Sequence, residues 1–306
     1  VSGATILTGF ERYASLFIDL PRAWTLIIVT LALGGIAIAG MRESAWFMAV
    51  TTLLGMAGLG YVVWVAAPAM GDAPVRLAET LGGIEMGMFA GLFLGAFLAF
   101  YSFIGFEDMA NLAEEVHDVR RTLPRAIMAA VVISLVVYAL VAIAATSVLA
   151  PDELAGAHAP LVAVVEAQGH PGVPLGLISL FIIVNGALGQ IIMATRLLMD
   201  MGRDRTGAPP MLGRVHPRTH TPVIATLAVT ATTLLLALFL PLATLANLTS
   251  AIMLAVFVTV NASLIVLKRR GQPEDVPDLP RWIPWAGLSL SLGALLAQAM
   301  FIAVDL

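Results

Sequence analysis

The sequence predicts an all-α protein that crosses a membrane several times. Hydrophobic residues make up 59% of the chain and charged residues only 12%, and the mean hydropathy is +0.95. Soluble domains are about one quarter charged, so folding alone could not remove this much apolar surface from water. The apolar residues also form runs of about 20, which is the length of a bilayer span.

Composition argues against several classes of function. The chain has no cysteine, which excludes disulfides, thiolate metal sites and cysteine nucleophiles. The net charge is −4 and no block of basic residues occurs, so nucleic-acid binding is not expected. No P-loop or nucleophile elbow is found. His216 and His220 lie in a proline-broken loop rather than on one helix, so we expect neither a metal site nor another cofactor.

Nine runs are long enough to be spans. They are Val1 to Leu20, Trp24 to Met41, Ala45 to Pro68, Gly87 to about Glu115, Ala126 to Leu149, Pro174 to Met199, Pro222 to Leu240, Leu242 to Leu267 and Trp285 to Val304. Short helices are expected at Val75 to Leu81 and, at the membrane interface, at Ala159 to Ala167. Both ends of the chain look cut, so we expect an internal fragment of a longer protein.

The basic residues indicate the orientation of these spans. Twelve of the sixteen lysine and arginine residues fall in loops on one side, at 40–44, 117–125, 200–221 and 268–282. Because loops rich in lysine and arginine stay in the cytoplasm, this side is predicted to be the inner one.

The stretch "FYSFIGFEDMANLAEEVHDVRRTLPRA" combines an apolar start with an acidic second half. At 100° per residue, the polar side chains from Glu107 to Asp118, with Thr122 beyond, form one stripe opposite an apolar face. The stripe is about 17 Å long and cannot face lipid, so it lines a water-filled path or packs on polar protein. Ser102 and Gly105 weaken the helix where the stripe begins. A helix broken there and a kinked, continuous helix both remain open.

Three segments resemble the amino acid–polyamine–organocation (APC) permeases. "FIGFEDMANLAEEVHDVRRTLPRAI" looks like the sixth-helix signature of that superfamily. "RLLMDMGRDRTGAPPMLGRVHPRTHTPVIATL" is similar to its eighth helix, cytoplasmic loop and ninth helix, and "GMRESAWFMAVTTLL" to its fifth-helix entry. The resemblance covers essentially the whole chain, from the late third to the eleventh of twelve helices.

This resemblance implies a five-plus-five inverted repeat with a broken sixth helix. The chain would be a single transporter domain, 1–306. Residues 1–86 would be the remainder of the first repeat, 87–267 the complete second repeat, and 268–306 a loop plus one C-terminal helix. The first helix, which typically receives the substrate carboxylate, would lie outside the chain.

The resemblance also implies where substrate binds. In the family, backbone carbonyls at the break accept hydrogen bonds from the substrate amino group, here at Tyr101, Ser102 and Ile104. Phe103 and Phe106 either form the wall of the site or simply pack, and Gly105 marks the break.

Other polar residues receive coupling or pathway roles. Coupling or a cytoplasmic vestibule is assigned to Glu107, Asp108, Asn111, Glu114 and Glu115. For Glu107, pairing with a cationic substrate and a structural hydrogen-bonding role stay open as alternatives. Asn185 and Gln190 of the eighth helix either line the pathway or hold helices together.

One position departs from the family pattern. Several members carry a titratable lysine in the fifth helix where this sequence has Gly55. Glu107 is then the leading intramembrane titratable group. The coupling ion, a proton or sodium, stays unassigned.

The expected function is secondary transport of an amino acid or related amine across the plasma membrane by alternating access. The expected partners are therefore a small-molecule substrate and membrane lipid, and no enzymatic activity is expected. A transporter-like sensor or scaffold that binds without moving its ligand is the alternative. A membrane-embedded enzyme would need an acid–base–metal constellation that the sequence does not show.

Overall fold

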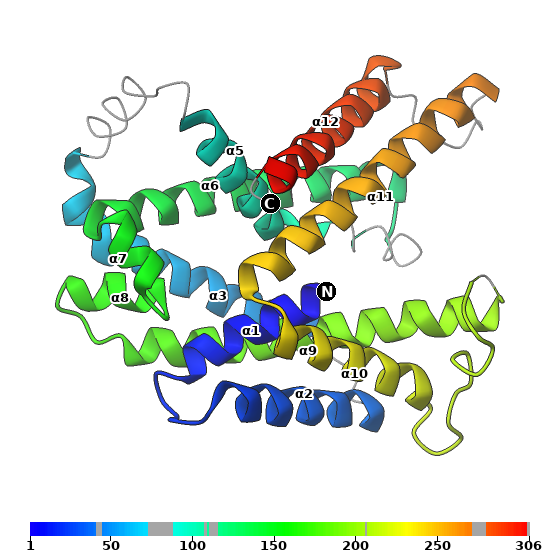
Figure 1. The fold of residues 1–306 in the computed structure, drawn as a ribbon, viewed down its shortest axis with the longest axis horizontal. Coiled ribbons are helices and arrows are strands. Elements are labelled where there is room, and N and C mark those ends of the chain that lie inside the picture. The colour runs from blue at the N-terminus through cyan, green and yellow to red at the C-terminus, as the bar shows by residue number, and fades with distance from the viewer. Residues whose placement is uncertain are drawn as a thin grey trace. The chain divides into compact units, whose positions relative to one another are not determined.

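The computed structural model describes residues 1–40, 45–72, 88–106, 109, 116–205, 207–270 and 280–304 (Figure 1). These residues form helices and connecting turns, and no strand occurs among them. Their contacts divide the chain into two compact units. We call Val1–Leu77 with Ala139–Leu245 the α9 unit, and Ala78–Tyr138 with Ala246–Leu306 the α5 unit.

The α9 unit is built around one long helix. Its elements are α1 (Ser2–Ala14), α2 (Arg22–Ala39), α3 (Ala45–Ala66), the 3-10 helix η1 (Ala67–Asp72), α7 (Pro151–Gly156), α8 (Pro160–Ala167), α9 (Val173–Arg203) and α10 (Val223–Phe239). Helices α1, α2, α3, α8 and α10 all pack against α9. Figure 1 shows α2, α9 and α10 side by side.

Two hydrophobic clusters form the core of the α9 unit. One joins α1, α2, α9 and α10 through residues such as Leu7, Leu26 and Ile191. The other joins α3 and α8 and includes Val62 and Val164. All five of these side chains are at most 1% exposed, which is the close packing expected of an apolar interior.

Small residues let two of these helices approach closely. A Cβ placed on Gly34 of α2 would lie 2.7 Å from Cγ2 and Oγ1 of Thr230 on α10. In lipid, where apolar burial does not drive association, such close backbone approach is a main source of helix–helix attraction.

Among the described residues, the α5 unit contains parts of two helices that it shares with the α9 unit, together with three elements of its own. Its elements are α5 (Met88–Phe100), the 3-10 helix η2 (Tyr101–Phe103), the first part of α6 (Val119–Val148), most of α11 (Leu242–Arg270), and α12 (Trp282–Val304). Helix α5 packs against α12. A Cβ on Gly287 of α12 would lie 2.5 Å from Oδ1 of Asn261 on α11, so these two helices also touch through a glycine.

Glycine and proline set several helix ends. Gly40 closes α2 with a φ of 78°, a left-handed backbone that glycine adopts without strain. Pro241 stands between α10 and α11, where Leu240 is already extended. Pro174 lies in the first turn of α9, where its missing N–H would have no partner in the helix.

Six helices among the described residues are long and apolar enough to cross a membrane. They are α2, α3 with η1, α6, α9, α11 and α12, and the predicted all-α, multi-span class is confirmed. Two further apolar helices, Gly91–Phe103 and Val223–Phe239, are shorter and correspond to the predicted fourth and seventh spans. The predicted end of the first span is wrong: α1 stops at Ala14, and the chain turns at Ser15, whose hydroxyl donates to the Arg12 carbonyl at 2.8 Å.

The connections also differ in part from the prediction. The short helix expected at Ala159 to Ala167 is confirmed as α8, and α7 before it was not predicted. The helix expected at Val75 to Leu81 lies outside the described residues. The inverted repeat, its boundaries and the membrane orientation stay predictions.

The continuous polar helix predicted through Asp118 and Thr122 is wrong at its end. Residues 116–118 form a turn, and Asp118 has a φ of 49°, which a helix cannot contain. Thr122 belongs to α6, which begins at Val119, seven residues before the span predicted from Ala126. Asp118 caps this new helix, because its carbonyl accepts the N–H groups of Arg121 and Thr122 at 3.0 and 2.9 Å.

Candidate functional site

The break predicted at Gly105 is present in the α5 unit. Helix α5 ends at Phe100, and η2 continues for only three residues. Ile104 is extended, with a φ of −68° and a ψ of 134°, and Gly105 has a φ of 127°. Since a residue with a Cβ rarely adopts that φ, the glycine permits the chain to leave the helix here.

Tyr138 of α6 binds this break, and the sequence gave no sign of it. Its hydroxyl donates to the Ser102 carbonyl at 3.0 Å. Its ring packs edge-on against Phe103, with 5.3 Å between the centroids. A single tyrosine among valines and leucines looks like lipid-facing sequence, and its backbone partner lies 36 residues away, so no local pattern could reveal the contact.

Aromatic side chains cover the other end of the break. Phe257 of α11 packs against Phe106 with 5.8 Å between the ring centroids, and against Phe100 at 6.2 Å. Two of these rings, Phe103 and Phe106, belong to the aromatic residues predicted for the wall. The structure places them in packing contacts with helices α6 and α11, and leaves both of them partly exposed.

Two of the three carbonyls predicted to meet substrate already accept hydrogen bonds within the protein. The Tyr101 carbonyl accepts the Ile104 N–H at 3.1 Å, and the Ser102 carbonyl accepts the Tyr138 hydroxyl. A carbonyl oxygen has two lone pairs, so each can still receive a second donor. Ser102 is exposed and Ile104 is partly exposed.

The predicted polar residues of α9 contact different helices of their own unit. Asn185 donates from Nδ2 to the Thr51 hydroxyl of α3 at 3.1 Å, and its Oδ1 is buried with no partner in the described part of the chain. Gln190 lies beside α1, because a Cβ on Gly3 would be 3.7 Å from its Cβ. Contacts of this kind hold neighbouring helices together. That Asn185 or Gln190 lines the substrate pathway stays a prediction.

Gly55 lies one turn beyond Thr51 on α3 and faces α9. A Cβ on Gly55 would lie 3.4 Å from Cδ1 of Ile182. A Cβ at this position would thus be in ordinary van der Waals contact with α9.

Comparison with known proteins decides the family. The family model described as amino acid permease matches residues 3–305. The chain belongs to the amino acid permease family. Its predicted APC membership is thereby confirmed, and it is an integral, multi-pass membrane protein. The family and the relatives are permeases and transporters, not enzymes.

Relatives of the permease carry different names. An uncharacterized transporter of Mycobacterium tuberculosis is 36% identical over 265 residues, which is 86% of this chain and 58% of the relative. The branched-chain amino acid permease of Bacillus subtilis is 28% identical, over 71% of this chain and 46% of the relative. A chloroplastic cationic amino acid transporter of Arabidopsis thaliana is 32% identical, over 83% and 44%. The chain spans about half the length of these relatives.

Some of the predicted site residues lie outside the described part of the permease. They are the predicted coupling and vestibule residues Glu107, Asp108, Asn111, Glu114 and Glu115. Their roles stay predictions. The six residues predicted to bind substrate, Tyr101 to Phe106, do lie together at one break in the backbone.

Proposed function

We propose that this permease moves an amino acid across the plasma membrane by alternating access, with substrate bound at the break after η2. The observation that carries the proposal is the extended, left-handed backbone at Ile104 and Gly105 directly after an apolar helix. Secondary transporters use such interruptions to present backbone groups to a substrate near the bilayer midplane.

The backbone of the break would bind the substrate amino group. An ammonium group carries three donors and needs acceptors held in fixed positions. The carbonyls of Tyr101, Ser102 and Ile104 are candidates, and the Ser102 carbonyl is oriented by the Tyr138 hydroxyl. Tyr138 therefore acts as a positioning residue, because it holds an acceptor in place.

The surroundings of the break favour an amino acid with an apolar side chain. Phe103 and Phe106 supply partly exposed aromatic surface, and Phe257 packs behind Phe106. Such surface gains free energy by covering apolar groups. The name of the Bacillus relative, a branched-chain amino acid permease, agrees with this choice, whereas that of the plant relative, a cationic amino acid transporter, does not.

Energy coupling is proposed for the acids that follow the break. Glu107 would exchange a proton with the pathway, while Asp108, Asn111, Glu114 and Glu115 would line the vestibule toward the cytoplasm. The Glu107→Gln variant is expected to lose uptake driven by a pH gradient while keeping exchange of substrate across the membrane. Gradient dependence equal to that of the unaltered protein would assign coupling to another group, including a sodium site.

Counterflow in proteoliposomes tests the proposal. Full-length protein is reconstituted into vesicles loaded with unlabelled leucine, and entry of labelled leucine is followed, with lysine-loaded vesicles as the comparison. The proposal predicts leucine counterflow that unlabelled leucine inside accelerates. Substrate binding without counterflow would instead support the sensor, and counterflow of lysine alone would contradict the apolar substrate class.

A further inference from the structure

The α9 unit contains a pocket of about 560 Å³ that the proposed transport function does not use. It is lined by the C-terminal end of α2, the last turns of α9, the loop before α10 and the first turn of α10. On the predicted orientation this is the cytoplasmic end of the unit.

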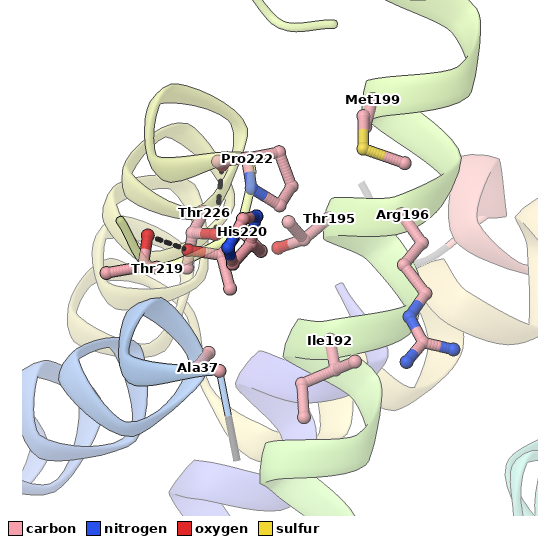
Figure 2. Close-up of a pocket in the computed structure, with 11 residues that line it drawn as sticks. Ala37, Ile192, Thr195, Arg196, Met199, Thr219, His220, Pro222 and Thr226 are labelled. Carbon is pink, nitrogen blue, oxygen red and sulfur yellow. Dashed lines mark hydrogen bonds between the residues drawn. The ribbon is translucent and has the colours of Figure 1, made fainter. Parts of the chain in front are cut away.

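A buried hydroxyl with no partner points into this pocket. Thr195 of α9 is only 4% exposed, and its Oγ1 has no hydrogen-bond partner among the described residues. Figure 2 shows the Thr195 hydroxyl directed across the pocket toward His220 and Thr226. An unpaired buried hydroxyl costs free energy, so a ligand that accepts its hydrogen bond would be stabilised here.

The wall opposite Thr195 is held in one conformation. The His216 N–H donates to the Thr221 carbonyl and the His220 N–H to the His216 carbonyl, both at 2.9 Å. The Thr221 hydroxyl donates to the Ile38 carbonyl at the end of α2 at 2.8 Å and lies 2.7 Å from the Thr219 hydroxyl. These bonds fix the loop on α2, so the pocket is formed without a ligand.

The charges around the pocket favour an anion. His220, with a φ of 55°, lies beside the Thr195 hydroxyl, and Arg196 also lines the pocket, with its guanidinium directed down α9 and away from these two side chains (Figure 2). Helix α10 begins here after Pro222, and a helix N-terminus carries partial positive charge. Among the described residues that line the pocket, none has an acidic side chain.

The place of the pocket in the α9 unit indicates where the anion comes from. Arg196 lies about two turns before the end of α9, and on the predicted orientation this end lies at the cytoplasmic membrane surface. Arginine near such a helix end meets the headgroup layer of the membrane. A polar pocket at this level matches the anionic head of a phospholipid.

We propose that this pocket binds the phosphate group of an anionic phospholipid. The Thr195 hydroxyl donates to a phosphate oxygen that lies beside His220 and the first turn of α10, and Arg196 adds a positive charge at the wall of the pocket. The same phosphate chemistry could be supplied by a soluble phosphate ester, and the experiment separates the two sources.

Lipid retention and thermal stability of the full-length protein test the proposal. The protein is placed in nanodiscs of phosphatidylcholine, with or without phosphatidylglycerol, and retained lipid is identified by native mass spectrometry. We expect phosphatidylglycerol to be retained and to raise the Tm. Arg196→Gln should lower the affinity about tenfold because it removes a positive charge from the wall of the pocket, and Thr195→Val about threefold because it removes a hydrogen-bond donor to the phosphate.

The matched control is Thr230→Val. Thr230 is also 4% exposed with an unpartnered Oγ1, but it faces Gly34 of α2 instead of the pocket. This variant should bind phosphatidylglycerol like the unaltered protein. All variants are first compared in phosphatidylcholine alone, so a folding defect is separated from a binding defect.

Glycerol 3-phosphate added to phosphatidylcholine nanodiscs distinguishes the source of the phosphate. If it raises the Tm as much as phosphatidylglycerol does, and Thr195→Val weakens this effect, the pocket is a phosphate site filled from solution. The proposal is overturned if neither molecule raises the Tm. It is also overturned if Arg196→Gln and Thr195→Val both bind phosphatidylglycerol as tightly as Thr230→Val does.

Discussion

Both hydrophobic core clusters found among the described residues lie in the α9 unit, whereas the break in the helical backbone lies in the α5 unit. In the α9 unit, helices meet through buried leucines, alanines and threonines, and glycine permits the close approach of α2 and α10. In the α5 unit, glycine permits an extended backbone that aromatic rings only partly cover. The same residue type thus supports packing in one unit and an irregular backbone in the other.

This difference suggests that the two units have different roles in transport. Closely packed interiors transmit strain and resist deformation, so the α9 unit is suited to act as a scaffold. A segment with few buried contacts and irregular backbone is easier to rearrange, so the break is suited to bind and release substrate. The following predictions test the contrast, starting with the largest effect.

Changing Gly105 to alanine should have the largest effect on transport. Among the described residues, no atom lies within 4 Å of a Cβ at Gly105, so we expect the φ of 127° rather than lack of space to oppose the change. Straining such a residue costs about 1–3 kcal/mol, and we expect uptake to fall by about tenfold or more. Gly95→Ala in α5 is the control, because a Cβ there also meets open space but the backbone is helical. Equal uptake by the two variants would contradict the role of the break.

Changing Gly34 to alanine should instead affect stability. Its Cβ would clash with Thr230 at 2.7 Å, and such overpacking costs about 1–3 kcal/mol. Thermal unfolding in detergent should show a Tm lowered by several degrees, with uptake per folded molecule little changed. Gly35→Ala, whose Cβ would meet no atom within 4 Å, should match or exceed the unaltered Tm. A normal Tm for Gly34→Ala would mean that α2 and α10 are not closely packed.

Removing the Tyr138 hydroxyl should have a smaller, selective effect. Tyr138→Phe keeps the ring against Phe103 but frees the Ser102 carbonyl. One hydrogen bond contributes about 0.5–1.5 kcal/mol, so we expect KM for substrate to rise about three- to tenfold with an unchanged Tm. Tyr61→Phe in the α9 unit, where Tyr61 stacks on Trp64, is the control and should leave KM unchanged. An unaltered KM in Tyr138→Phe would show that the Tyr138 hydroxyl does not position the Ser102 carbonyl for substrate.

Removing the Asn185–Thr51 hydrogen bond should have the smallest effect, and this effect should be on the free energy of unfolding. Interhelical hydrogen bonds in membranes average about 0.6 kcal/mol by double-mutant cycles. A cycle of Thr51→Val and Asn185→Ala, read from the free energy of unfolding in mixed micelles, should show coupling of about that size. A cycle without coupling would indicate that Asn185 is held by other contacts and would reopen its predicted role in lining the pathway.

The sequence was sufficient where the physical signal is local. Long apolar runs predicted the spans, and a glycine following an apolar helix and preceding acids predicted the break. Proline between two apolar runs predicted the separation of α10 from α11. Each of these features depends on neighbouring residues alone.

The sequence was insufficient where a residue acts at a distance or against its usual preference. The Tyr138 contact depends on how α6 packs beside the break. Asp118 breaks a good helical pattern by adopting a left-handed φ, which aspartate tolerates but periodicity does not reveal. The unpartnered hydroxyl of Thr195 is recognised only once the loop from His216 to Thr221 is folded against α2.

Hydrogen exchange of the full-length protein, followed by mass spectrometry with and without leucine, tests the central claim most directly. Substrate bound at the break should slow exchange of the amides in the segment from Tyr101 to Phe106, while those of α9 and α10 stay unchanged. Unchanged exchange at the break, with protection by leucine confined to the α9 unit, would contradict this assignment of the substrate site.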